Sequence, residues 1–98
     1  MQVAVIPISE KVIEYAEAVT RALREQELRV TLDSRNERLQ KKVRDCEIEK
    51  IPYMVIVGEK EETQRNLSIR SKAQGDIGKM AASDFVSMLK EEIKKKVR

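Results

Sequence analysis

Histidine is absent from this sequence of 98 residues, and its absence excludes several kinds of catalytic site. Without an imidazole there is no Ser–His or Cys–His nucleophile pair, and the commonest zinc ligand is missing. The sequence has one cysteine, Cys46, which leaves no partner for an internal disulfide and indicates a reducing compartment. We therefore expect a cytoplasmic protein in which Cys46 fills part of the core rather than reacting.

Glycine and aromatic residues are also scarce. The three glycines, Gly58, Gly75 and Gly78, form neither a G-x-G-x-x-G motif nor a Walker loop, so the usual phosphate-binding loops are excluded. Two tyrosines and one phenylalanine are too few for an aromatic stacking platform. Long apolar runs are missing as well, because no stretch approaches the roughly 20 residues that a membrane-spanning helix needs. We expect no membrane partner.

Charge, by contrast, is abundant. Charged residues make up 38% of the chain and hydrophobic residues 41%, with a net charge of +3. The length suits one small domain, residues 1–98, with a single core. A mildly basic balance permits a polyanionic partner without requiring one. The basic residues gather in the middle and at the end of the chain, at Arg35, Arg38, Lys41, Lys42, Arg44, Lys90, Lys94, Lys95, Lys96 and Arg98.

Hydrophobic patterning predicts four strands and a minimal fifth. The apolar run IPYMVIV at residues 51–57, which stops at Gly58, predicts a strand buried on both faces. Residues 3–8 predict a second buried strand. Alternation over residues 28–32 indicates a strand nearer a sheet edge. Residues 66–71 predict a strand that is antiparallel at an edge, followed by a turn at residues 74–78 and the minimal strand.

Three helices are expected between and after these strands. The first runs from Ser9, whose hydroxyl is expected to cap it, to about Gln26. The second carries Leu39, Val43 and Cys46 on one face, and residues 59–63 are expected to form a solvated acidic loop. The apolar stripe of the last helix is Phe85, Val86, Leu89, Ile93 and Val97. The order predicts a three-layer α/β/α domain with a mixed, about five-stranded sheet and three helices.

Three polar residues are expected to converge near the carboxyl ends of the strands. Asn36 follows one strand, Glu61 follows Gly58 at an exposed position, and Arg70 lies on a strand that returns from the same edge. A carboxylate accepts from guanine N1–H and N2–H₂, an arginine donates to O6 and N7, and an asparagine does both. This chemistry suits unpaired nucleobases of RNA.

Several motifs together resemble a known family. The segments DSRNE at residues 33–37, KVRD at 42–45, IPYMVIVGEKE at 51–61 and IR at 69–70 closely resemble the C-terminal anticodon-binding domain of threonyl-tRNA synthetase. The resemblance runs over essentially the whole chain. It implies that Asn36, Glu61 and Arg70 read the anticodon bases. It also implies weaker contacts to the RNA backbone, which do not depend on the base sequence of the RNA. These contacts would come from Arg35, Arg38, Lys42, Arg44 and Lys72.

The resemblance implies a function as well. The domain is expected to bind the anticodon loop of threonine tRNA while a separate catalytic domain of the parent synthetase receives the acceptor end. No cofactor is expected here, because ATP and zinc would belong to that catalytic domain. One alternative is a free-standing synthetase-like paralogue acting as a protein-interaction or regulatory module, which predicts the loss of one or more base readers. The other is a small α/β enzyme, which the lack of histidine and of a nucleotide loop disfavours.

Overall fold

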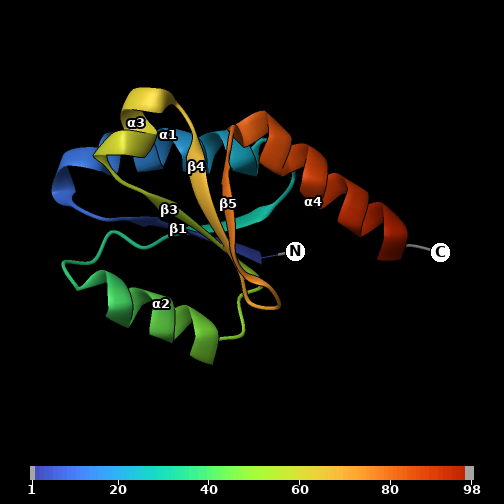
Figure 1. Ribbon diagram of the computed structural model, residues 1–98, viewed down its shortest axis with the longest axis horizontal. Helices are drawn as coiled ribbons and strands as arrows, with labels where there is room; N and C mark the ends of the chain where they lie inside the picture. Colours follow the sequence, from blue (N-terminus) through green and yellow to red (C-terminus); the bar gives the residue numbers. More distant parts are fainter. Residues whose placement is uncertain (1, 97–98) are drawn as a thin grey trace.

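The computed structural model describes residues 2–96 and has ten helical and strand segments (Figure 1). Val97 and Arg98, expected in the last helix, lie outside the described residues. In chain order the segments are β1 Gln2–Pro7, the 3₁₀ helix η1 Glu10–Val12, α1 Ile13–Arg24, β2 Arg29–Leu32, α2 Leu39–Ile48, β3 Tyr53–Val57, α3 Glu59–Gln64, β4 Leu67–Ser71, β5 Gly75–Met80 and α4 Ala82–Lys96.

The five strands form one mixed sheet in the order β2-β1-β3-β4-β5. β1 pairs in parallel with β2 and β3, whereas the β3–β4 and β4–β5 pairs are antiparallel. The predicted central position of residues 51–57 and the edge position of residues 28–32 are confirmed. The predicted edge position of β4 is wrong, because residues 75–80 form a full strand outside it. Gly75 and Gly78 have φ of +75° and +99° there, a backbone conformation that alternation of side chains does not indicate.

The helices lie on both faces of the sheet, as predicted. In Figure 1, α2 is on one side, and α1, α3 and α4 are on the other. Because β1 and β3 are buried on both faces, their side chains point alternately into two hydrophobic cores, one on each side of the sheet. The larger core joins the sheet to α1 and α4 and includes Val5, Leu23 and Phe85. The smaller core joins it to α2 and includes Ile6, Cys46 and Met54.

The entry into α1 differs from the prediction. Ser9 precedes η1, but its hydroxyl makes no capping hydrogen bond. The backbone carbonyl of Ser9 instead accepts from the N–H of Val12 at 3.3 Å. Ile8, expected to belong to a buried strand, follows the end of β1 and is 51% exposed. The chain thus turns out of the sheet one residue earlier than its apolar run indicates.

Residues 59–64 form helix α3, so the expected loop is wrong, and residues 2–96 contain four α-helices where three were predicted. Glu61, at the third position of α3, accepts a hydrogen bond from the N–H of Gly58 through Oε1 at 2.7 Å. This contact satisfies a backbone donor at the start of the helix, as in one half of a capping box. The segment lacks the apolar stripe from which helices are predicted.

Candidate nucleic-acid interface

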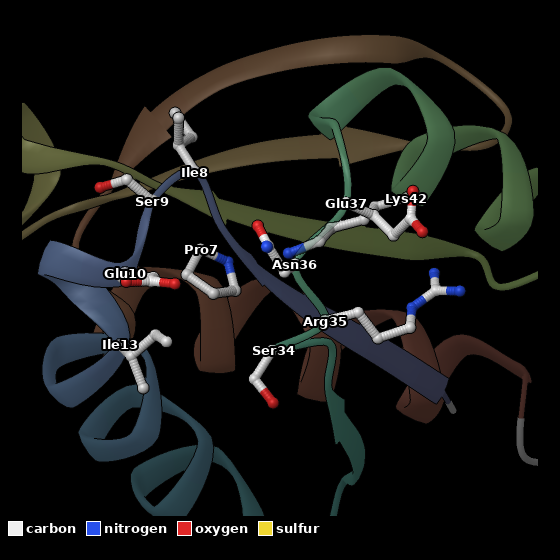
Figure 2. A pocket seen from close by; sticks show the side chains of 10 residues that line it. All are labelled: Pro7, Ile8, Ser9, Glu10, Ile13, Ser34, Arg35, Asn36, Glu37 and Lys42. Carbon is white, nitrogen blue, oxygen red and sulfur yellow. The ribbon is translucent and has the colours of Figure 1, made fainter.

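Three loops meet at the carboxyl ends of β1, β2 and β3. A cavity of about 250 Å³ lies between the loop after β1 and the loop after β2, and Ile8, Ser9 and Asn36 are among the residues that line it (Figure 2). A second, more open hollow of about 460 Å³ is lined by Ile8 and Ser9 together with residues 58–61. The Ile8–Ser9 loop therefore separates Asn36 on one side from Glu61 on the other.

Asn36 is exposed, and its neighbours hold the loop in shape. In Figure 2 it lies between Pro7 of β1 and the start of α2. Arg35 donates to both carboxylate oxygens of Asp33 at 2.9 and 2.8 Å and to Asp45 of α2 at 3.0 Å. The hydrogen bond from Arg35 is the main reason why the pKa of Asp33 lies below its ordinary value. Asn36 thus projects from a loop that ion pairs fasten to α2.

The residues predicted to contact the RNA backbone differ in exposure and in the partners that they already have. Arg38, Arg44 and Lys72 are exposed, as a phosphate contact requires. Arg35 is half exposed but already bound to two carboxylates. Lys42 differs most from a solvated cation, because it is only 4% exposed and its ammonium donates to the backbone carbonyl of Asp33 at 3.1 Å.

Glu61 is also placed differently from the sequence expectation. It is 6% exposed, so the prediction of an exposed side chain is wrong. One oxygen accepts from Gly58 N–H, and Oε2 pairs with the ammonium of Lys79 on β5 at 3.0 Å. Burial alone raises the pKa of Glu61, but the hydrogen bonds from Lys79 and Gly58 outweigh it and leave the pKa below its ordinary value. The side chain is therefore a fixed carboxylate.

Gly58 allows this arrangement through its small size. Its backbone is extended, with φ −129°, so conformational freedom is not the reason for a glycine. A Cβ at this position would lie 2.9 Å from the Cδ1 of Ile8 and 3.2 Å from Oε1 of Glu61. Both groups would have to move, so the Ile8 side chain and the Glu61 carboxylate pack against the Gly58 backbone where a larger residue would leave no room.

Register places Arg70 and Lys79 on the face of the sheet that carries α2. Arg70 pairs with Met54, and Lys79 pairs with Ser68, which in turn pairs with Ile56. Paired residues share a face, and Met54 belongs to the core beneath α2. Arg70 and Lys79 are both exposed. In the described residues, this face is thus open to solvent over β4 and β5.

The three predicted base readers are brought together in part. Asn36 and Glu61 flank one loop, and Lys79 reaches Glu61 from the open face. Arg70 lies on that face two residues further along β4 than Ser68, a displacement of about 7 Å at strand spacing. That displacement carries Arg70 away from the carboxyl ends of the parallel strands, towards its partner Met54 near the start of β3. Sequence reasoning missed Ile8 and Lys79, since neither exposure past a strand end nor pairing across a bulge is visible in the pattern.

Other chemistries find little support in the described part of the chain. Cys46 is buried, as expected, and burial is the main cause that raises the pKa of its thiol to about 11. Over residues 2–96 no group of three acidic, cysteine or histidine side chains is placed to hold a metal ion. No helix in this range has the length and apolar character to cross a bilayer.

The fold, with its polar loops at the carboxyl ends of the strands, defines an α/β domain of a known class. The family described as "Anticodon binding domain" matches residues 2–92, and the chain belongs to this family. Within it, the resemblance to threonyl-tRNA synthetase is confirmed by relatives of that name. The threonine–tRNA ligase of Bacteroides thetaiotaomicron is 48% identical over 92 residues, which are 94% of this chain and 14% of that protein. That of Clostridium kluyveri is 43% identical over 97 residues, 99% of this chain and 15% of the relative.

Solved structures agree with the fold. The RNA-binding domain of threonyl-tRNA synthetase from Cryptosporidium parvum superposes with a TM-score of 0.87 at 25% identity, over 92% of this chain and 23% of that one. Histidyl-tRNA synthetase from Nostoc gives 0.86 at 22% identity, over 94% of this chain and 22% of that one, and shares the fold alone. The chain spans about 15% of the length of the curated relatives that it matches.

Proposed function

We propose that this domain binds the anticodon loop of threonine tRNA. One observation carries the proposal: Asn36 and Glu61 flank a single loop at the carboxyl edge of the sheet, beside an open basic face that holds Arg70. Unpaired bases of RNA loops are recognised by hydrogen bonds along their edges. Side chains of these three types, two at the edge and Arg70 on the adjoining face, supply the donors and acceptors that such recognition needs.

The chemistry of the anticodon fits these groups. Threonine anticodons share a central guanine followed by uracil, and a carboxylate complements the N1–H and N2–H₂ donors of guanine. Arg70 supplies two parallel donors for a base or a phosphate. Ile8, half exposed between Asn36 and Glu61, offers an apolar surface against which a base can lie. Exposed Arg38, Arg44 and Lys72 would contact the RNA backbone and set the orientation.

The partners follow from the relatives. The domain would serve as the tRNA-recognition module of a threonine–tRNA ligase in translation. A separate catalytic domain would bind ATP and zinc and receive the acceptor end. This domain would itself need no cofactor. We expect it to act in the cytoplasm, where tRNA is charged.

A titration with anticodon stem-loops tests the proposal. We expect the wild-type domain to bind a threonine anticodon stem-loop more tightly than a stem-loop whose central guanine is replaced. Glu61→Gln should weaken cognate binding by about 1–3 kcal/mol and reduce discrimination at the central base. Glutamine retains an oxygen that can accept from Gly58 N–H, so the start of α3 is preserved while the charge is lost. Fluorescence anisotropy at fixed salt measures both affinities.

The matched control is Glu59→Gln, which removes an exposed carboxylate from the same helix. This variant should leave discrimination unchanged. Equal binding of the cognate and guanine-replaced stem-loops by the wild-type domain would contradict the proposal.

A further inference from the structure

Lys79 is not among the RNA-contacting residues that the resemblance to the synthetase implies. It lies on β5, opposite Ser68, and its side chain is 45% exposed. Its ammonium lies 3.0 Å from Oε2 of Glu61, whose own side chain is only 8% exposed. A mostly buried carboxylate is thus paired with a lysine that comes from a different element and is partly exposed on the open face.

The acceptor capacity of Glu61 shows what this pair does to the site. An ionised carboxylate has about four lone-pair positions. Gly58 N–H occupies one of them, on Oε1, and Lys79 occupies another, on Oε2. The backbone N–H of Glu61 itself also hydrogen-bonds the carboxylate, so about one of the four positions remains. A single donor on the edge of guanine, N1–H or N2–H₂, is enough to occupy it.

We propose that Lys79 is a positioning residue of the RNA site, which together with the Gly58 amide fixes the carboxylate of Glu61 so that its remaining acceptor position meets a base edge. This inference rests on the proposed function. The Gly58 N–H, at the start of α3, and the Lys79 ammonium, on β5, each donate to a different oxygen of Glu61. These two contacts prevent rotation of the carboxylate. Removal of the ammonium leaves the group free to turn and easier to protonate.

A plain phosphate contact is the competing explanation for a half-exposed lysine on a basic face. The two roles differ in what they change. A phosphate contact carries no sequence information and weakens all RNA alike. A residue that orients Glu61 changes discrimination at the base that Glu61 contacts, and its effect disappears when Glu61 is altered.

A double-mutant cycle separates these roles. Lys79→Met keeps the alkyl stem and removes the charge, and we combine it with Glu61→Gln in the whole domain. We expect Lys79→Met to reduce discrimination between the cognate and guanine-replaced stem-loops by roughly 3- to 10-fold, a modest share of one good base contact. In the Glu61→Gln background the same change should leave discrimination unaltered. Lys79→Arg should restore most of it.

Lys72→Met provides the matched control, since Lys72 is exposed on the same hairpin. It should weaken both stem-loops by the same factor in either background. If Lys79→Met behaves like Lys72→Met, or its effect on discrimination persists with Glu61→Gln, the proposal is overturned. If the wild-type domain does not discriminate at all, the proposed function fails, and the effect of Lys79 on Glu61 is then judged without RNA.

A measurement without RNA distinguishes the two failures. The carboxyl carbon of Glu61 reports its titration by NMR, and Lys79→Met should shift the pKa of Glu61 upward, while Lys72→Met should not move it. An unchanged pKa would overturn the positioning role directly. A raised pKa together with absent discrimination would place the error in the proposed function instead.

Discussion

Glu61 serves two purposes with a single side chain. Its Oε1 accepts from the Gly58 amide and so starts α3, and its Oε2 meets Lys79 at the open face. A carboxylate held in this way is a stable element of the fold before any RNA arrives. Pre-formed groups lose less entropy on binding than mobile ones. The position of Glu61 thus shows how a short acidic segment presents a fixed carboxylate.

Lowering the pH should remove the contribution of the ionised Glu61 side chain to the stability of the fold. The folded-state pKa of Glu61 lies below the ordinary value of 4.5. Its ionised form therefore stabilises the fold fully above that value, and the contribution disappears as the pH falls through the folded-state pKa. The difference in free energy of unfolding between wild type and Glu61→Gln should be constant from about pH 6 to 7 and shrink towards about pH 3. Urea denaturation over this series measures it.

Replacing Glu59, an exposed carboxylate in the same helix, supplies the comparison. For Glu59→Gln we expect a difference from wild type that is small throughout. A difference for Glu61→Gln that stays constant down to the lowest pH would show that the ion pair with Lys79 contributes nothing to stability.

At the scale of elements, α2 is fastened to the sheet edge by more than its apolar face. Lys42 is buried in this helix and donates to the carbonyl of Asp33, at the end of β2. Arg35 joins Asp33 to Asp45 from the outside of the same loop. These contacts set the loop that carries Asn36, so the helix and the candidate reader are positioned together.

Lys42→Met should therefore act on stability. We expect the free energy of unfolding to fall by about 1–3 kcal/mol, because a buried carbonyl loses its donor. Arg44→Met, at an exposed position of α2, should change it by no more than about 0.5 kcal/mol. Thermal or chemical denaturation compares the two. If Lys42→Met leaves stability intact and weakens all stem-loops equally, Lys42 is the phosphate contact that the sequence indicated.

Much of this architecture follows from the sequence, and the exceptions have physical causes. β1 and β3 were predictable because apolar runs bounded by proline and glycine have few other structures available. α3 was missed because its six residues carry no apolar stripe, and its start depends on one side chain folding back on Gly58. The site was predicted as residue types converging on one edge, but register places Arg70 opposite Met54, further along the sheet from Asn36 and Glu61. The burial of Glu61 was not predicted, because it depends on Lys79 from a strand that reaches it only through register.

For the whole molecule, charge is distributed unevenly over the two faces of the sheet. Arg38, Arg44, Arg70, Lys72 and Lys79 belong to the edge and face that also carry α2, whereas Lys90 lies on α4, on the other side. The net charge of +3 does not show this placement. Placement of the basic residues, more than their number, favours a polyanion.

Salt dependence tests this placement. The logarithm of the binding constant should fall linearly with the logarithm of salt concentration, and Lys72→Met should reduce the slope by about 0.7, the value for one contact to a single strand. Lys90→Met removes the same charge from α4 and should leave the slope unchanged. Titrations at three or more salt concentrations provide the slopes. An equal reduction by both variants would show that overall charge, and not a defined face, governs binding.

The outer strand also determines how the sheet ends. An edge strand presents free backbone groups that can pair with another chain, and folded proteins discourage such pairing with charge, glycine and irregular register. β5 combines Asp76 and Lys79 with two glycines of positive φ, and its pairing with β4 shifts between Ile69 and Arg70. A sixth strand from a neighbouring molecule would therefore meet a twisted, charged border. The lysine that reaches Glu61 thus also helps to keep this sheet from growing by edge-to-edge aggregation.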